Sequence, residues 1–155
     1  MAVEHWVAGS GVGFTWTACF GAEVNSLASG NAVIGSVVIS NQTALDEFAD
    51  VSFSLGSIVV PAGAPFVGIY LYPLNQDASS YGDGKFSTTA AGPPGSSYFV
   101  AAIPVPVGTQ VCTGSATGIV IPPGTFKFLI YNATGIVFAA ASNTVSYRTY
   151  NRSIV

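Results

Sequence analysis

Apolar and polar residues alternate with a period of two along several stretches of the chain, as they do in half-buried β-strands. Val51, Phe53 and Leu55 would share one face of such a strand, with serines on the other. The segments 126–131 and 144–150 alternate in the same way. Strands are therefore predicted at 13–20, 32–40, 50–60, 66–73, 98–103, 109–113, 116–121, 125–132, 135–140 and 144–150.

Turn-forming residues separate these segments. The chain holds 18 Gly and 9 Pro, and they recur with Asn, Ser and Thr at the roughly 8–12-residue spacing of sandwiches and barrels. One helix of one or two turns is predicted at 43–49, with Thr43 as N-cap and two acidic residues in its first turn.

Two stretches, 58–70 and 119–131, resemble each other. Each has a short apolar strand, a Pro-x-Gly turn and a longer strand that ends in tyrosine. Proline presets φ for a turn and glycine accepts a positive φ after it. A corner that recurs in this way suits a double Greek key. We predict an all-β, jelly-roll-like antiparallel β-sandwich with at most one short helix, formed by residues 13–155 as a single domain, with an N-terminal arm at 1–12.

Charged residues make up only 7% of the 155 residues, against about 25% in a typical domain. Lys and Arg number four, which argues against a nucleic-acid partner because phosphate binding needs a basic surface. The apolar runs are shorter than the roughly 20 residues of a membrane-spanning helix. No basic segment precedes Glu4, so we expect no secretion signal. We also expect no membrane as a partner.

The residues available for catalysis are few. His5 is the single histidine, which argues against a Ser-His-Asp arrangement and a zinc site. Asp46, Glu47 and Asp50 fall in one short helix or turn, where a solvated face is expected rather than a carboxylate pair across a cleft. The two cysteines, separated by 93 positions in apolar or small-residue contexts, are expected to be buried thiols, although a disulfide is possible. We expect no enzyme, no cofactor and no metal.

Three weaker motifs carry little information. The glycine-rich segment 9–13 lacks the strand and helix of a phosphate loop. The polar loop 75–95 contains two aspartates, which are too few to predict calcium binding. The glycosylation-like triplets at Asn41, Asn132 and Asn151 are expected to be chance matches, because no export is predicted.

A sandwich with so few charges must fill its outward positions with Ser, Thr, Ala, Gly, Val and Tyr. Assembly interfaces are depleted in charge and enriched in aromatic residues, so the composition favours obligate assembly. The 19 aromatic residues leave a sugar-binding role open, since exposed rings can stack on sugars. Pairs such as Tyr70 with Tyr72, or Tyr98 with Phe99, are more often packing residues.

Three segments carry a resemblance to a family of small structural proteins of tailed-phage virions. They are 71–77 (LYPLNQD) with 81–84 (YGDG), 119–128 (IVIPPGTFKF) and 141–151 (ASNTVSYRTYN). The resemblance spans about two-thirds of the chain. It implies a component of the phage particle, and jelly-roll cement (decoration) proteins of capsids are the best match in role. It implies no catalytic residue.

The resemblance leads us to expect a non-enzymatic virion structural protein, made in the host cytoplasm, that binds the outer capsid surface and stabilises the shell. The expected partners are the major capsid protein and further copies of the chain, as a trimer rather than a dimer. The alternative is a tail-associated receptor- or carbohydrate-binding module. From their position and apolar content, residues 1–16 and 150–155 are expected to make the outside contacts, through Trp6, Trp16, Tyr150, Arg152 and Ile154.

Overall fold

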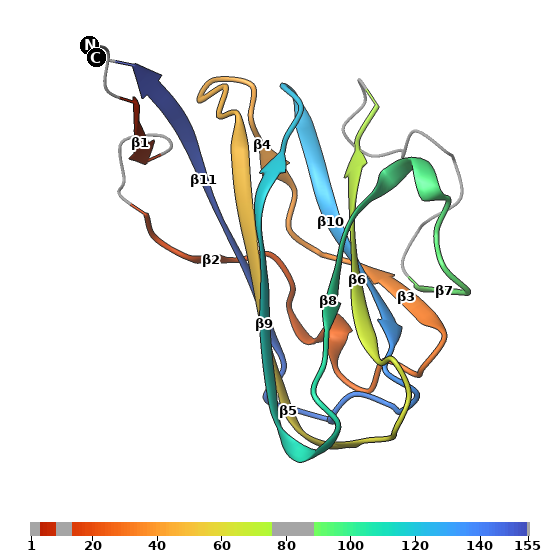
Figure 1. Cartoon of the computed structure of the whole chain (residues 1–155). Helices are drawn as coiled ribbons and strands as arrows, with labels where there is room; N and C mark the ends of the chain where they lie inside the picture. Colours follow the sequence, from red (N-terminus) through yellow and green to blue (C-terminus); the bar gives the residue numbers. More distant parts are fainter. Residues whose placement is uncertain (1–3, 9–13, 76–88, 155) are drawn as a thin grey trace.

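The computed structural model describes residues 4–8, 14–75 and 89–154, and it is built from two antiparallel sheets that pack face to face (Figure 1). Its strands are β1 (Glu4–Ala8), β2 (Thr17–Ala18), β3 (Asn31–Ile34), β4 (Ile39–Ser40), β5 (Phe48–Val60), β6 (Phe66–Pro73), β7 (Thr89–Ala91), β8 (Phe99–Pro104), β9 (Gly108–Val120), β10 (Thr125–Ala133) and β11 (Thr144–Ile154). The helical residues in the described ranges form two single 3₁₀ turns, η2 (Ala22–Val24) and η3 (Ser96–Tyr98).

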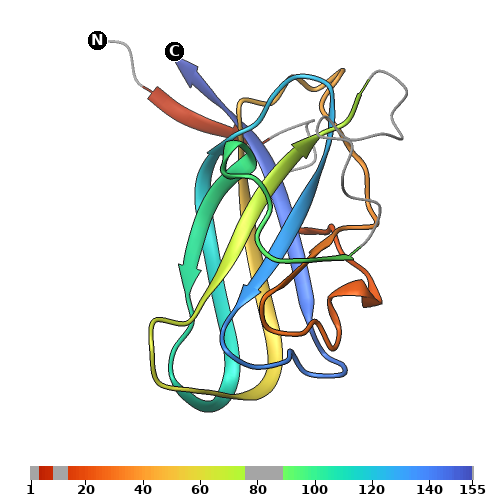
Figure 2. The ribbon, with the colours of Figure 1, turned by 90° about the vertical axis from the view of Figure 1, so that its right-hand side faces the viewer.

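The strand order is that of a jelly roll. Sheet A has the order β1-β11-β5-β9, and β2 also pairs with β11; sheet B has the order β7-β3-β10-β6-β8, and β4 pairs with β10. The pairs are nested, because β2 pairs with β11, β3 and β4 with β10, β5 with β9, and β6 with β8. The two halves of the chain thus form one long antiparallel hairpin that wraps into two layers. Figure 2 looks onto sheet B, with sheet A behind it. The predicted all-β jelly-roll sandwich is confirmed.

The two Pro-x-Gly corners occupy equivalent places in this roll. Each carries the chain from sheet A to sheet B, the first between β5 and β6 and the second between β9 and β10. Gly63 has a φ of 142° and Gly124 a φ of 110°, the conformation that glycine adopts without a steric penalty. The repeated corner in the sequence therefore marks a repeated turn in the fold.

The core lies between the sheets and follows the predicted alternation. Val51, Phe53 and Leu55 are buried, and the serines between them are half-buried on the outward face. A second apolar cluster covers the outward face of sheet B. There Tyr72 stacks on Tyr98 with ring centroids 4.4 Å apart, so these tyrosines are packing residues.

The strand predicted at 135–140 is wrong. These residues form an irregular loop, and only Phe138 of the loop's large side chains is fully buried in the core. The Asn132 amide fixes the loop, because it donates to the Leu27 and Ile136 carbonyls while its oxygen accepts from Thr134. A buried polar side chain replaces the strand ladder here.

The helix predicted at 43–49 is also wrong. Asn41 closes this segment as a turn, since its amide donates to the Asp46 carbonyl (2.9 Å) and its oxygen accepts from the Asp46 N–H (2.7 Å). Leu45 takes a left-handed conformation, with φ 50°, which interrupts a right-handed helix. Asn41, rather than Thr43, therefore organises the turn.

Other boundaries differ because of local packing. The segment predicted as 32–40 is two strands, separated at Gly35, where an added Cβ would lie 2.4 Å from the Cys19 carbonyl oxygen. The strands predicted at 109–113 and 116–121 are the single strand β9. Of the predicted strand 13–20, the structure describes 14–20, and within that part only Thr17–Ala18 is a strand. Within the predicted arm 1–12, residues 4–8 form β1, which pairs with β11. The glycine-rich segment 9–13 and most of the loop 75–95 lie outside the described residues.

Both cysteines are free and buried, as expected for thiols that act as small apolar groups. Burial raises the pKa of the Cys19 thiol to about 12, and it also raises the pKa of Cys112. Since the thiolate is the reactive form, we expect both thiols of the folded chain to react with Ellman's reagent at pH 8 at least about a hundredfold more slowly than in the urea-unfolded chain. Rapid release of one thiol equivalent from the folded chain would contradict this burial.

Candidate functional site

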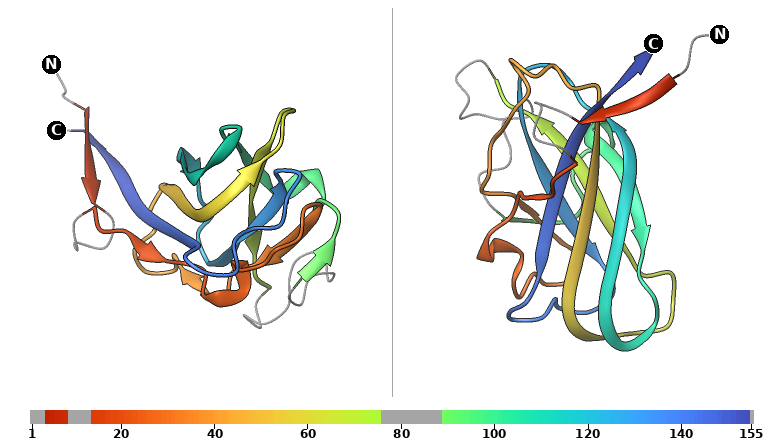
Figure 3. Two further views of the ribbon diagram at one scale, coloured as in Figure 1. Left: turned by 90° about the horizontal axis from the view of Figure 1, so that it is seen from below. Right: turned by 90° about the vertical axis from the view of Figure 1, so that its left-hand side faces the viewer.

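Strand β11 continues beyond the sandwich. It pairs with β5 as far as Tyr150, opposite Phe48, and then runs on to Ile154 paired with β1. This two-stranded ribbon projects from one end of the molecule in every view (Figures 1 to 3). The ribbon therefore extends this end of sheet A beyond the sandwich.

Aromatic rings gather where the ribbon leaves the sandwich. The Tyr150 ring contacts Trp6 (centroids 5.2 Å apart), Phe48 (5.7 Å) and Phe14 (6.3 Å). We call Trp6, Phe14, Trp16, Phe48 and Tyr150 the aromatic end. Trp6 is 56% exposed, Phe14 45% and Trp16 41%, so much of this aromatic surface faces outward.

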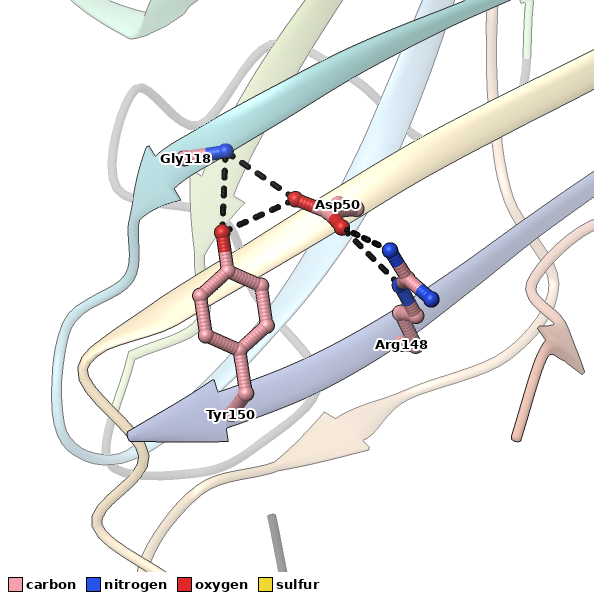
Figure 4. Close-up of polar contacts among 4 residues, drawn as sticks. All are labelled: Asp50, Gly118, Arg148 and Tyr150. Atoms are coloured by element: carbon pink, nitrogen blue, oxygen red, sulfur yellow. Dashed lines mark hydrogen bonds and ion pairs between the residues drawn. The ribbon is translucent and has the colours of Figure 1, made fainter. Parts of the chain in front are cut away.

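A buried carboxylate holds the aromatic end in place (Figure 4). Asp50, only 3% exposed, lies on β5. Its Oδ2 accepts from Arg148 Nε (2.9 Å) and lies 2.8 Å from Arg148 Nη2. Its Oδ1 accepts from the Tyr150 hydroxyl (3.0 Å) and the Gly118 N–H (3.0 Å). One side chain thus links β5, β9 and β11.

A bulge in β9 makes this arrangement possible. Ala49 pairs with Ile119 and Val51 with Ala116, so two residues of β9, Thr117 and Gly118, lie opposite Asp50 alone. Gly118 has a φ of 69°, in the left-handed region that glycine adopts without a steric penalty. The bulge brings the Gly118 N–H to Asp50 and to the Tyr150 oxygen (3.2 Å).

The Arg148 guanidinium contacts aromatic rings of the site as well as Asp50. Its guanidinium carbon lies 4.8 Å from the Trp16 ring centroid and 5.6 Å from that of Phe14, which is cation–π geometry. Burial and the hydrogen bond to Asp50 raise the pKa of Tyr150 above its ordinary value. Tyr150 therefore stays a neutral donor to the carboxylate at physiological pH.

Two shallow cavities of about 440 Å³ each flank Phe48 and Tyr150. One is lined by Trp6, Phe14, Asp50, Thr117, Arg148 and Tyr150. The other is lined by Asn41, Leu45, Asp46, Glu47, Phe48, Val120, Ile121, Pro123 and Arg152. Both volumes fall within the usual range for small-molecule sites.

The structure brings the sequence-predicted contact residues to one end of the molecule. Trp6 lies opposite Arg152 on the ribbon, and Trp16 joins the cluster through Arg148. Ile154 is placed by its strand register, opposite Glu4. Tyr150 differs from expectation, since its ring is buried among its neighbours and its hydroxyl is bonded within the chain.

Sequence reasoning missed Phe14, Phe48, Asp50 and Arg148 as members of this site. Asp50 and Arg148 have opposite charges, and both stand at outward positions of alternating strands. Pairing β5 with β11 would have placed them face to face, as the observed register Arg148↔Asp50 does. The two opposite charges are visible in the sequence, but their pairing can be inferred only when the strand order is known.

The acidic residues near 46–50 do not form the expected solvated helix face. Asp46 is buried and accepts from the Asn151 amide (2.9 Å), while Asp50 serves the site above. Within residues 4–8, 14–75 and 89–154, no three His, Cys, Asp or Glu side chains converge as a metal site would require. The same ranges contain no helix with the length and apolar character to span a membrane.

Along β5 after Asp50, and on the strands paired with it there, the outward face of sheet A is uncharged. Rows of hydroxyl side chains cross it, Thr144 beside Ser54 and Thr113, and Ser146 beside Ser52 and Ser115. We call these six residues the hydroxyl face. The sequence expectation that small and hydroxyl residues fill outward positions is met on this sheet.

No family model matches the sequence, and neither a curated protein nor a solved structure is significantly similar to the chain. The resemblance to virion structural proteins therefore stays a prediction from the sequence.

The Asp50 network predicts a graded loss of stability. Asp50→Ala leaves Arg148 without its partner at a site where it is only 31% exposed, so we expect a loss of about 2–4 kcal/mol in the free energy of unfolding. Tyr150→Phe removes one hydrogen bond and should cost about 1 kcal/mol. Urea unfolding measures both, with Thr113→Ala on the hydroxyl face expected within about 0.5 kcal/mol of wild type. Equal stabilities for Asp50→Ala and Thr113→Ala would refute the role of this network.

Proposed function

We propose that this chain is a non-enzymatic structural protein of a tailed-phage virion, a cement or decoration protein that binds the outer surface of the capsid and stabilises the shell. The observation that carries the proposal is the surface of sheet A, which joins an exposed aromatic end to an uncharged hydroxyl face. The jelly-roll fold and the sequence resemblance support the same role, although jelly rolls serve many others.

The aromatic end has the composition of a binding hot spot. Trp, Tyr and Arg dominate the energetics of protein interfaces, and here they lie together where the projecting ribbon leaves the sandwich. The Asp50–Arg148 pair is neutral as a whole, so covering it with a partner leaves no uncompensated charge. Exposed Trp6 and Trp16 rings would bury apolar area against the major capsid protein.

The contact has a simple mechanical consequence. A subunit that binds across neighbouring capsid proteins must be broken before the shell can expand, so each bound copy opposes internal pressure. Several copies joined as a homo-oligomer would add to this through multivalent binding. The protein would then lie on the capsid surface of the virion.

Trp6 gives the direct test of this proposal. Trp6→Ala removes a ring that is 56% exposed. Loss of a hot-spot tryptophan costs at least about 2 kcal/mol, or roughly thirtyfold in affinity. We expect the variant to bind purified shells of its phage at least thirtyfold more weakly, as measured by co-sedimentation, with an unchanged circular dichroism spectrum.

Phe99→Ala is the matched control, because Phe99 is also an exposed aromatic residue (44%) but lies on β8 of sheet B. It should bind shells as the wild type does. If Trp6→Ala binds shells as tightly as the wild type does, the aromatic end is not the capsid contact. The same conclusion follows if Phe99→Ala weakens shell binding as much as Trp6→Ala does. Wild-type chain that does not bind shells at all would refute the cement role.

A tail-associated receptor- or carbohydrate-binding module is the second candidate, and the cavity beside Tyr150 favours it. Trp6 and Phe14 line that cavity together with the polar groups of Thr117, Asp50 and Arg148, a combination that suits a sugar ring. On a glycan array this candidate predicts binding by the wild type that Trp6→Ala abolishes and Phe99→Ala retains. If the wild type binds no glycan on the array but does bind shells, the cement role is the candidate that remains.

A further inference from the structure

We propose that strand β9 pairs antiparallel with β9 of a second copy of this chain, so that the two A sheets join across a two-fold axis. β9 is the last strand of sheet A and forms its border in the right-hand view of Figure 3. This contact lies on the edge opposite β1 and β2 and is independent of the capsid-binding proposal.

The free edge of β9 carries backbone N–H and C=O groups that can pair with another strand. Every second residue of an edge strand directs its N–H and C=O away from the sheet. In the part of the chain that the structure describes, β5 is the one strand that pairs with β9, and no other backbone segment bonds to residues 109–117. An extended segment added to this edge would replace the hydrogen bonds to water with a strand ladder.

The other sheet edges of the described residues are short or blocked. At the opposite border of sheet A, β1 has 5 residues and β2 has 2. In sheet B, β7 has 3 residues, and β8 has 6 and ends at Pro104, which cannot donate a hydrogen bond. β9 has 13 residues, so the protection seen at the other edges is missing here.

The usable part of the β9 edge is the segment 109–116. The bulge of β9 itself lies beyond this segment, at Thr117 and Gly118, and the second irregularity places its extra residue on β5, between Leu55 and Ile58. The backbone of 109–116 can therefore present a continuous ladder. No proline interrupts it.

Charge and side-chain size identify the partner as a second copy. A two-fold axis places 109–116 opposite itself, which a charged strand would resist through like-charge repulsion. No charged residue lies between Lys85 and Lys127, and the outward side chains of 109–116 are Thr, Val, Thr and Ser. The segment is thus both a template and a fitting occupant, and one isologous contact satisfies both edges.

Exposed apolar area lies beside the proposed axis. Val111 on β9 and Val59 on β5 are each 58% exposed, and Val59 pairs with Thr109, two residues from Val111. Such diagonal neighbours on one face of a sheet interact. Pairing two copies would place the strand of the second copy beside Val111 and would extend the hydroxyl face over both subunits.

Thr113, near the centre of 109–116, provides the test. We expect the full-length chain to sediment as a dimer of twice 15.8 kDa in analytical ultracentrifugation. Thr113→Lys and Thr113→Glu should each raise the dimer dissociation constant at least about tenfold, because like charges meet at the axis. An equimolar mixture of the two variants should recover a dimer, since opposite charges then face each other.

Val137→Lys is the control, since Val137 is 49% exposed in the loop between β10 and β11, and its dimer should match the wild type. A wild-type monomer at about 0.1 mM would overturn the proposal, as would a trimer, the state expected from the sequence. A wild-type dimer that neither Thr113 variant weakens, or a mixture that stays monomeric, would place the contact elsewhere. Each of these outcomes leaves the capsid experiment with Trp6→Ala unaffected.

Discussion

The carboxylate of Asp50 is the interaction on which the outward side of sheet A depends. It accepts from groups on β9 and β11 while lying on β5, so it ties together three strands that are far apart in the sequence. A buried carboxylate without donors would be costly, and the glycine bulge of β9 supplies one of them. The Arg148 guanidinium, fixed by Asp50, in turn places Phe14 and Trp16 beside the ribbon.

The scarcity of charge gives this arrangement its functional meaning. An ordinary domain covers its outward strand faces with Lys, Glu, Asp and Arg. Here β5 after Asp50, all of β9, and β11 before Arg148 contain no charged residue. Hydroxyl groups keep part of that surface compatible with water, and the aromatic rings and valines mark where protein contact would be favourable. The proposed capsid contact and the proposed β9 pairing use opposite borders of the same sheet.

Local sequence signals were reliable where one interaction dominates. Alternation placed the buried face of β5, because burial of apolar side chains on one face of a strand leaves a period of two. The paired Pro-x-Gly corners located two of the crossings between the sheets, from β5 to β6 and from β9 to β10. The signals failed at 43–49 and 135–140, where the buried amides of Asn41 and Asn132 bond to backbone groups and hold turns that composition alone does not encode.

The sequence by itself determined the all-β class, the double Greek key and an exterior poor in charge, because each follows from short-range periodicity, turn chemistry or counting. The prediction that Trp6, Trp16, Tyr150, Arg152 and Ile154 make outside contacts stays a prediction. Only the tertiary structure decided that Asp50 faces Arg148 and Tyr150, and that β9 rather than another strand lies at an open edge. Those facts depend on strand order and register, which are set by contacts between residues far apart in the chain, such as Asp50 and Tyr150, 100 positions apart.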